Sequence, residues 1–300
     1  MTAINEKWAN LLEPGLRQIF DITRDGMAAQ AVAPQLFNVS TSSKAQEHDL
    51  GEGGFGDWNE YKGTINYDDD DEGWKTTYTH AEFVKGFAVE RKLVDDDLYN
   101  IINRKPRKLA ISAERTKEKA AASVFNNAFS SSYAGGDAVE LCGAHPYSPV
   151  NASTQANNGT SALTYDNVIA TRKLMRAYTD DRAELVSVMP DTILVPPELE
   201  NTAWEILEST NKPDTANNNG NYVRSNGFRL IVWDYLTDAN NWFMIDSGLA
   251  SLYLNWFDRV PLEFTADPTS DYNLVAKYRG YMRYSYGWSD WRWVYGHAVA

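Results

Sequence analysis

Residues 44–82 constrain the fold of this chain more than any other segment, because they cannot bury a core of their own. The string KAQEHDLGEGGFGDWNEYKGTINYDDDDEGWKTTYTHAE is rich in glycine, aspartate and aromatic residues and has almost no aliphatic side chains. A loop of this length without a core is uncommon in compact domains and is usually functional or packed on something else. Because aromatic side chains are spread along it, we expect an arm that lies on a partner. The irregular pattern of residues 1–40 predicts a second arm.

The charge of the chain is unevenly distributed. The 300 residues carry a net charge of −13, yet residues 91–130 carry +4, against −9 for residues 1–90 and −8 for residues 131–300. A strongly acidic protein is unsuited to binding polyanions over its whole surface. Any such binding is therefore expected to use the basic segment.

This basic segment predicts a long helix. Apolar residues recur every three to four positions over 107–131, which is typical of a helix with one buried stripe. Three aspartates before it suit the positive end of the helix dipole, and Pro106 is expected to break or kink the helix. Lys108, Arg115 and Lys119 share one face, which is either a solvated charged face or a surface turned toward a polyanion.

The middle of the chain, residues 161–265, predicts an α/β-like module. Thr164 can cap a helix, a buried-type strand follows at 193–195, and Pro197 suits the first turn of the next helix. Two further strands, FRLIVWDYL and NWFMID, are separated by a short polar turn. Helices and strands together predict an α+β fold for the chain.

The segment 274–288 has the clearest periodicity. Aromatic and apolar side chains alternate with polar ones, which predicts a long half-buried strand. The parity of the aromatic residues flips at Ser289–Asp290, so a turn or bulge is expected there. Lys277, Arg279 and Arg283 project from one face of the strand, either as ordinary solvent-exposed residues or as a second surface for a polyanion.

Two motifs in the glycine-rich arm lack the context that their chemistry needs. Gly51–Gly56 matches G-x-G-x-x-G, but no buried strand precedes it and no helix follows it, so nucleotide binding is not expected. Asp68, Asp70 and Glu72 match the opening ligands of a calcium loop, whose twelfth position is then a glutamate. That position is Thr79, so we expect a solvated acidic loop, with a loose cation site as the alternative.

No motif predicts catalysis, a metal or a cofactor. Asp246–Ser247–Gly248 matches the catalytic loop of aspartic proteases, in which two aspartates share one proton. The second aspartate comes from a second Asp-Ser/Thr-Gly motif, and the sequence has no such motif. Cys142 and His145 offer two metal ligands without further histidines at ligand spacing. We therefore expect no enzyme. No apolar run approaches the roughly 20 residues of a membrane-spanning helix, so no membrane partner is expected either.

Five strings, taken in order, resemble one protein family. They are YTHAEFVKGFAVERKLVDDDLY, AVELCGAHP, LTYDNVIATRKLM, PDTILVPPELENTAWEIL and VAKYRGYMRYSYGWSDWRWVYG. Over about residues 65–296 the chain resembles the HK97-fold major capsid proteins of tailed bacteriophages, most closely the Mu-like major head subunits. The resemblance implies an HK97-like fold with an N-arm, an E-loop, a P-domain of a long spine helix and long strands, and an A-domain.

The resemblance also implies how the chain is divided and what it does. The parts are the N-arm (1–43), the E-loop (44–82), the P-domain (83–130 and 266–290) and the A-domain (131–265 and 291–300). Such a subunit self-assembles through pentamers and hexamers into an icosahedral shell that encloses packaged double-stranded DNA. The shell belongs to the virion and is assembled in the cytoplasm of the host bacterium.

Further partners follow from the same resemblance. A portal protein is expected at one vertex, packaged DNA is expected to be bound without sequence specificity, and a decoration protein is left open. Because the arm begins within a few residues of Met1, we expect a separate scaffolding protein.

In that family the E-loop and the N-arm lie across neighbouring subunits, which agrees with an arm that has aromatic residues but no core. The residues expected to contact a neighbour from the E-loop are Trp58, Tyr61, Lys62, Tyr67, Trp74, Lys75 and Tyr78. The residues expected to face the lumen and its DNA are Lys108, Arg115, Lys119, Lys277, Arg279 and Arg283, with the acidic residues outside.

The alternative function is an aromatic-rich glycan-binding module of a phage tail fibre. Its tryptophan and tyrosine clusters would stack on sugar rings, which requires exposed aromatic side chains in a compact protein. The alternation over 274–288 instead predicts buried aromatic side chains, so this alternative ranks second.

Overall fold

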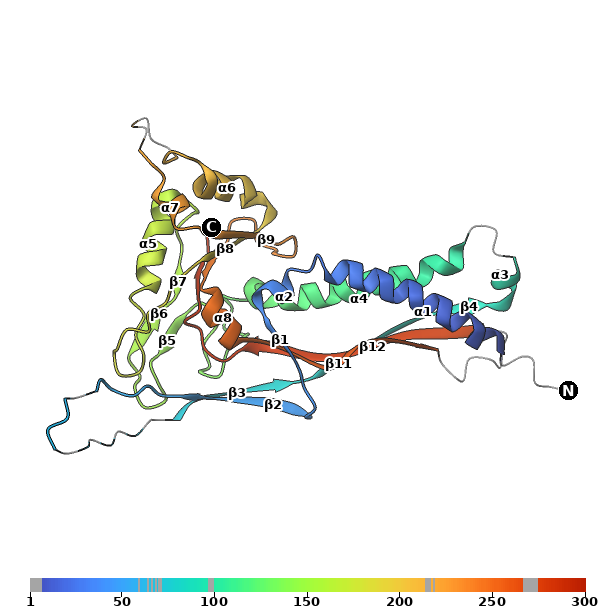
Figure 1. The fold of residues 1–300 in the computed structure, drawn as a ribbon, viewed down its shortest axis with the longest axis horizontal. Helices are drawn as coiled ribbons and strands as arrows, with labels where there is room; N and C mark the ends of the chain where they lie inside the picture. The colour runs from blue at the N-terminus through green and yellow to red at the C-terminus, as the bar shows by residue number, and fades with distance from the viewer. Residues whose placement is uncertain are drawn as a thin grey trace.

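The computed structural model has an elongated half, a more compact half and a hairpin that projects from them (Figure 1). It describes residues 7–58, 60–63, 65, 67, 69, 72–96, 100–213, 217, 219–266 and 275–300. Within these ranges no helix combines the length and the apolar character needed to cross a membrane. Asp68 and Asp70 of the calcium-loop pattern lie outside the described residues.

The elongated half is a two-layer structure of helices on a sheet. Its strands are β1 (Asn38–Thr41), β4 (Ala81–Glu90), β11 (Leu254–Ala266) and β12 (Val275–Trp288). Its helices are α1 (Lys7–Ala28), α2 (Ala33–Leu36), α3 (Arg91–Asp95) and α4 (Ile101–Asn126). The strand order is β1-β11-β12-β4, antiparallel except for the parallel pair of β1 and β11. Helices α1 and α4 lie side by side on one face of this sheet (Figure 1).

Strand β12 confirms the predicted long, half-buried strand. Tyr278 and Tyr284 are buried, whereas Lys277 is exposed. A Cβ on Gly280 would lie 3.6 Å from the side chain of Leu109 in α4. The even-numbered residues of β12 therefore face the helices, and the odd-numbered residues face away from them.

Helix α4 confirms the long helix but corrects its beginning. It starts at Ile101 and runs through Pro106 without a break, where a break or kink was predicted. Pro106 lies in the second turn, so it removes only one backbone hydrogen bond close to the N-terminus of the helix. Its side chain is buried. The buried stripe of α4 contains Leu109, Ala110, Ala121, Val124 and Phe125.

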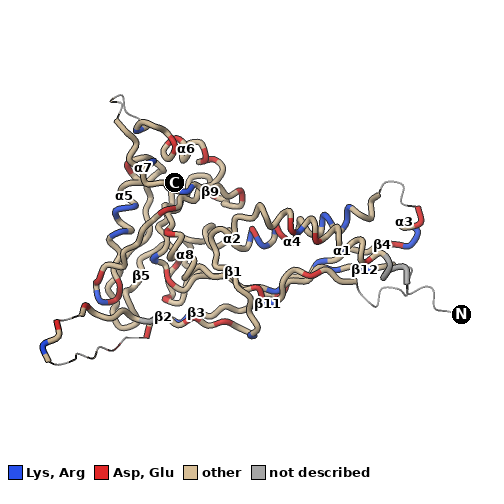
Figure 2. Tube along the Cα trace, in the orientation of Figure 1, with Lys and Arg blue, Asp and Glu red and all other residues tan. Residues whose placement is uncertain are grey.

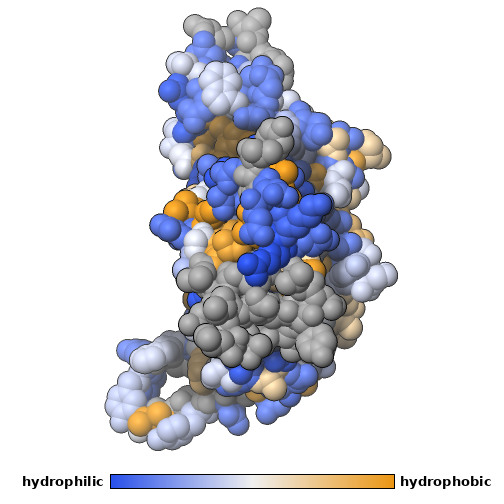
Figure 3. Space-filling view, turned by 90° about the vertical axis from the view of Figure 1, so that its right-hand side faces the viewer, coloured by the Kyte–Doolittle hydropathy of each residue, from blue (hydrophilic) through white to orange (hydrophobic). Residues whose placement is uncertain are grey.

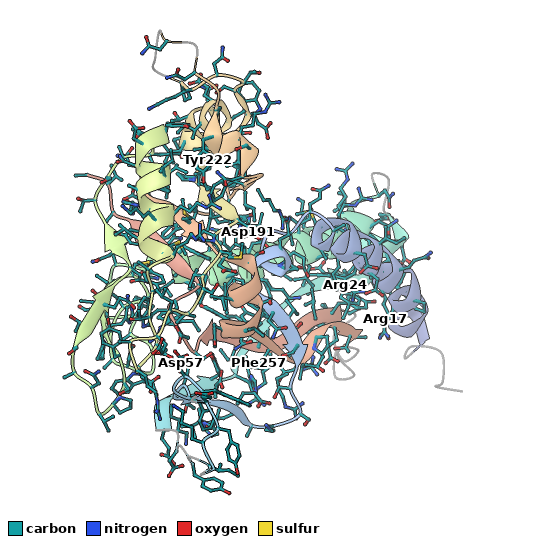
Figure 4. The ribbon with its side chains drawn as sticks, turned by 60° about the vertical axis from the view of Figure 1, so that its left-hand side comes forward. Arg17, Arg24, Asp57, Asp191, Tyr222 and Phe257 are labelled. Carbon is teal, nitrogen blue, oxygen red and sulfur yellow. The ribbon has the colours of Figure 1, made fainter. Side chains whose placement is uncertain are left out.

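The irregular N-terminal arm was a wrong prediction for most of its length. Residues 7–28 form α1, which packs along α4. Leu16 and Phe20 are buried four residues apart on one face, and Phe20 stacks on Phe264 of β11 with ring centroids 5.0 Å apart. Arg17, labelled in Figure 4, is exposed and pairs with Glu13 one turn earlier in the helix. The helical period is thus present, with Pro14 inside it.

The compact half contains a five-stranded sheet with helices around it. Its strands are β7 (Asn158–Gly159), β8 (Thr192–Val195), β9 (Arg229–Val232), β10 (Trp242–Ile245) and β13 (Val294–His297). Its helices are α5 (Tyr165–Met175), the 3₁₀ turn η1 (Pro197–Leu199), α6 (Glu200–Glu208), α7 (Tyr222–Ser225) and α8 (Ser247–Tyr253). A small hairpin of β5 (Ala144–Pro146) and β6 (Thr154–Ala156) lies beside them.

The predicted helix cap, the strand at 193–195 and the helical turn at Pro197 are confirmed, whereas the strand predicted from FRLIVWDYL is shorter and ends at Val232. The hydroxyl of Thr164 accepts a 3.3 Å hydrogen bond from the amide of Asn167 at the start of α5, and Pro197 opens η1 before α6. The sheet order is β7-β13-β10-β8-β9, so β8 lies between β9 and β10 although those two are consecutive in the chain. β8 pairs parallel with β9 and antiparallel with β10.

One short turn joins the two sheets. β12 ends at Trp288 and β13 begins at Val294, and the predicted change of parity occurs between them. The indole nitrogen of Trp293 donates a 2.8 Å hydrogen bond to the carbonyl of Asp290, and the guanidinium of Arg292 lies 2.6 Å from the Asp290 carboxylate. Trp291 and Trp293 are both buried. The turn therefore divides the aromatic side chains between two cores: Trp293 packs on Phe125 of α4, whereas Trp291 packs on Tyr178 in the core of the compact half.

The two motifs of the compact half have structural explanations. The Asp246 carboxylate accepts hydrogen bonds from the amide of Leu249 at 3.1 Å and from the amide of Met189 at 2.7 Å, so it caps α8. Cys142 is buried, and burial raises the pKa of its thiol. His145 lies 2.6 Å from the Asp137 carboxylate and stacks on Trp291. Among the described residues, no cluster of three His, Cys, Asp or Glu side chains is placed to hold a metal ion.

Candidate interaction surfaces

The glycine-rich arm is a two-stranded antiparallel hairpin of β2 (Gln46–Glu52) and β3 (Glu72–Thr79). The segment between the strands, residues 53–71, is called the hairpin tip below. Its aromatic side chains point into solvent: Trp58 is 97% exposed, Tyr67 87% and Tyr61 72%. In Figure 3 the tip projects below the body as a separate lobe. Phe55, which we did not single out from the sequence, is exposed beside them.

The remaining predicted hairpin residues fall into two groups. Lys62 and Lys75 are exposed, and the Lys62 ammonium lies 3.4 Å from the Glu60 carboxylate. Trp74 is half-buried. Tyr78, by contrast, is only 3% exposed and packs on Phe257 of β11 (labelled in Figure 4), with ring centroids 5.1 Å apart. Burial raises the pKa of Tyr78 to about 12. Its ring is used within the chain and is not available to a neighbour.

A loop of the compact half holds both sides of the hairpin tip. The amide of Gly54 donates a 2.9 Å hydrogen bond to the carboxylate of Asp181, and the guanidinium of Arg182 donates a 2.6 Å hydrogen bond to the carbonyl of Asp69. A Cβ on Gly54 would lie 2.7 Å from the carboxylate of Asp180, so a larger residue here would have to displace that side chain. We call these contacts the hairpin latch.

The glycines of the G-x-G-x-x-G string therefore serve packing at two points. The first point is Gly54 at the latch. The second is Gly51, whose backbone lies so close to Gly73 of β3 that a Cβ on Gly73 would be 2.6 Å from the carbonyl carbon of Gly51. A bulge interrupts the strand register here, between Leu50 and Glu52.

The base of the hairpin is tied to the sheet through a buried histidine. His80, which separates β3 from β4, lies between two hydroxyls, with Nε2 at 3.2 Å from Ser42 Oγ and Nδ1 at 2.9 Å from Ser285 Oγ. Ser42 in turn donates a 2.7 Å hydrogen bond to Glu47. Burial, and next the nearby charge of Arg283, lower the pKa of His80, so its neutral form is favoured.

The outer face of α4 is basic. Lys108, Arg115 and Lys119 are exposed along it, as the predicted shared face requires. Basic positions recur along the α4 segment of the chain (Figure 2). The acidic residues of the helix are turned away from this face: Glu114 is buried, and Glu118 accepts hydrogen bonds from the amide of Ala33 and from other groups inside the protein. Two further exposed bases, Arg104 and Arg107, extend the face and were missed as candidates.

The predicted bases of β12 lie on the opposite side of the two-layer half. Lys277 and Arg279 are exposed on the face of the sheet that points away from α4, and Arg283 is partly buried beside them. The Arg283 guanidinium lies 3.7 Å from the Glu82 carboxylate, and Glu263 is exposed on the same face. This face is therefore mixed in charge, and the two basic sets cannot line a single wall.

Comparison with known proteins places this chain among capsid subunits. The family model described as "Phage capsid protein" matches residues 74–296. No curated protein sequence matches the chain. The fold is similar to that of the capsid of the native GTA particle, with 15% identity, 89% of both chains covered and a TM-score of 0.56.

Two phage capsids have similar folds. The capsid of bacteriophage JBD30 has 13% identity over 69% of this chain and 91% of that one, with a TM-score of 0.56. The mature capsid of bacteriophage PhiM1 has 11% identity over 90% of this chain and 87% of that one, with a TM-score of 0.58. The predicted likeness to Mu-like subunits in particular stays a prediction.

Proposed function

Because this chain belongs to the phage capsid protein family, we propose that its copies assemble through pentamers and hexamers into an icosahedral shell around double-stranded DNA. The chain is a major capsid protein of the virion, with an HK97-like fold and a structural rather than an enzymatic role. The family match over residues 74–296 carries this conclusion. Closed symmetry then requires that the same surfaces be reused by every copy.

The domain division fits this role as follows. The elongated half supplies the P-domain (83–130 and 266–290), with α4 as the spine helix, and the compact half supplies the A-domain (131–265 and 291–300). The E-loop (44–82) is the hairpin. The N-arm (1–43) contains α1, so in this subunit it is mainly a docked helix rather than a free extension.

The hairpin tip is the surface that we assign to contact with a neighbouring subunit. Trp58, Tyr61 and Tyr67 support the assignment, because large aromatic side chains this exposed have no surface to pack on among the described residues of their own chain. Buried aromatic anchors carry much of the binding energy of protein interfaces. Lys62 lies within the tip, and Trp74 and Lys75 follow it in β3. Tyr78 is withdrawn from the set, because it is buried.

The outer face of α4 is the surface that we assign to the packaged DNA. Its exposed bases carry no exposed acidic neighbours on the helix, whereas the bases of β12 share their face with Glu82 and Glu263. Phosphate contacts by lysine and arginine are independent of sequence and depend on salt, which suits non-specific packing of DNA. Lys277, Arg279 and Arg283 then face outward.

Other components of the particle are part of the proposal. A portal protein at one vertex and a separate scaffolding protein are expected for such a shell, and a decoration protein remains open. The structurally similar JBD30 capsid is decorated with minor capsid protein trimers, which is a property of that particle.

The glycan-binding alternative has no observation in its favour. The aromatic side chains of β12, among them Tyr278 and Tyr284, are buried in the core or stacked on other rings. Sugar-binding sites are expected to be concave. The exposed aromatic residues of the hairpin lie instead on a projecting tip.

Electron microscopy with light scattering tests the assembly. The chain is purified alone and together with the scaffolding protein of the same phage. We expect pentamers, hexamers or closed shells in at least one of the two preparations. A monodisperse monomer in both would overturn the proposed assembly.

A further inference from the structure

The inner end of the hairpin and the body of the subunit enclose a groove that neither surface assigned above uses. It has a volume of about 590 Å³ and lies between residues 75–79, the end of α4, the loop at 133–136 and the last residues of β12. Pockets that bind small molecules have volumes of about 300–1,000 Å³. We propose that this groove binds a small, planar aromatic anion. The proposal concerns the single subunit and does not depend on the assembly of shells.

The walls of the groove suit a flat ring. Phe83, Tyr284, Tyr286 and Trp288 line it with aromatic side chains. Tyr284 is fixed in place, because its ring stacks on Phe83 at 4.6 Å and on Trp256 at 4.5 Å between ring centroids. Aromatic rings prefer such stacked or edge-on contacts with other rings. Since this wall is already formed, a flat ligand can bind with little loss of side-chain freedom.

Two hydroxyls of residues that line the groove have no hydrogen-bond partner within the described part of the chain. They belong to Tyr284 and Thr76, and both oxygen atoms are buried. Tyr284 as a whole is only 1% exposed. Buried hydroxyls without a partner are costly and uncommon. A ligand that carries a hydrogen-bond acceptor would give these donors a partner, and a charged acceptor forms the stronger bond.

The charge of the lining selects an anion. Among the described residues that line the groove, Lys75 has the only charged side chain, and it is exposed. No aspartate or glutamate lines this part of the structure, although the chain as a whole carries a net charge of −13. The groove is therefore expected to attract a carboxylate or a similar group and to disfavour an amine.

A molecule in this groove contacts the hairpin and the body at once. Thr76 belongs to β3 of the hairpin, whereas Tyr284 belongs to β12. The loop at 133–136 comes equally close, because a Cβ on Gly136 would lie 2.8 Å from the hydroxyl of Thr76. A bound ligand is therefore expected to hold the inner end of the hairpin against the body and to slow hydrogen exchange there.

Calorimetric titration of the purified full chain with 2-naphthoate tests the proposal. The uncharged 2-naphthamide has nearly the same shape and is the control probe. We expect 2-naphthoate to bind with a Kd of about 1 mM or tighter. We expect 2-naphthamide to bind more weakly, and hydrogen exchange at residues 75–79 to slow only when a probe is bound.

Tyr284→Phe removes one of the two free hydroxyls and is expected to weaken the binding of 2-naphthoate about tenfold. The matched control is Tyr178→Phe. The hydroxyl of Tyr178 is also buried without a partner among the described residues, but it lies in the core of the compact half. Its removal is expected to leave the affinity unchanged.

Lys75→Gln tests the choice of an anion. It is expected to reduce the preference for 2-naphthoate over 2-naphthamide about two- to fivefold, as an exposed ion pair would. Lys85→Gln is the control, because Lys85 is an exposed base of β4 outside this groove. The control variant is expected to keep the full preference.

Several results overturn the proposal. They are no binding of 2-naphthoate at several times the expected Kd, equal binding of 2-naphthamide, and equal effects of Tyr284→Phe and Tyr178→Phe. Binding that is lost when subunits assemble would assign the groove to a segment of a neighbour and also overturn it. If Tyr284→Phe does not fold, Thr76→Val takes its place. A chain that binds 2-naphthoate as expected but never forms shells contradicts only the proposed assembly.

Discussion

The indole nitrogen of Trp233 donates a 2.8 Å hydrogen bond to the carboxylate of Glu118, which joins the compact half to α4. The same carboxylate accepts hydrogen bonds from the amides of Ala33 at 3.0 Å and Val32 at 3.3 Å, where α2 begins. One side chain thus connects the N-terminal segment, the spine helix and the compact half.

We expect Glu118→Ala to lower the free energy of unfolding by about 1–3 kcal/mol, because it leaves three donors without their acceptor. Chemical denaturation of the purified subunit measures this change. Lys119→Ala is the control, since Lys119 is the next residue of the helix and is exposed. Equal stability of the two variants would contradict the role of Glu118.

The buried His297 predicts a loss of stability in acid. Its Nδ1 lies 3.2 Å from the amide of Ser161 and its Nε2 lies 2.8 Å from the hydroxyl of Thr171, and burial lowers the pKa of His297 to about 4. The unfolded chain binds a proton at this site below about pH 6.5, whereas the folded chain resists it. The free energy of unfolding therefore falls as the pH drops from about 6.5 toward 4.

In the wild-type chain, protonation at His297 is expected to lower the free energy of unfolding by roughly 2 to 3 kcal/mol between pH 7 and pH 4.5. Denaturation curves at both pH values for the wild type and for His297→Gln measure it, and the variant is expected to show a smaller difference. His48→Gln is the control, because His48 is exposed. A variant with the full wild-type pH dependence would refute the assignment to His297.

The hairpin latch predicts slow hydrogen exchange at the Gly54 amide. Asp181→Ala removes the acceptor of that amide, so exchange at residues 53–58 is expected to become faster and proteolysis of the tip easier. Glu184→Ala is the matched control, an exposed acidic residue of the same loop. If both variants exchange at the wild-type rate, the latch does not hold the tip.

The basic face of α4 predicts a defect in DNA content without a defect in assembly. Arg115→Glu combined with Lys119→Glu is expected to give shells that retain less DNA, and that lose it at lower salt than wild-type shells do. The absorbance ratio of purified particles over a salt series measures this. Lys277→Glu with Arg279→Glu provides the comparison, and a larger loss from that pair would place the lumen on the other face.

The periodic elements were predictable from the sequence. The alternation over 274–288 and the apolar stripe of α4 each have one buried face, and period alone identifies them. Helix α1 was missed although Leu16 and Phe20 have helical spacing, because Pro14 and mixed charges obscured the pattern.

The contacts of the candidate surfaces were less predictable, because they join distant parts of the chain. Tyr78 looks like the other hairpin aromatics, and only its packing on Phe257 removes it from the surface. Gly54 and Asp181 form the latch without any local signal. The opposite placement of Lys108 and Lys277 depends on which face of the sheet α4 covers, which neither segment encodes alone.

The turn between β12 and β13 leaves the chain no slack. Trp291, Trp293 and Tyr295 follow this turn and are all buried, and Asp290 accepts hydrogen bonds from the indole of Trp293 and from the guanidinium of Arg292. Inserting or deleting one residue at Ser289–Asp290 would move these side chains out of the closely packed positions that they fill. Length changes that loops usually absorb are therefore expected to destabilise the subunit at this point, and tagged or inserted versions of the subunit should be built elsewhere.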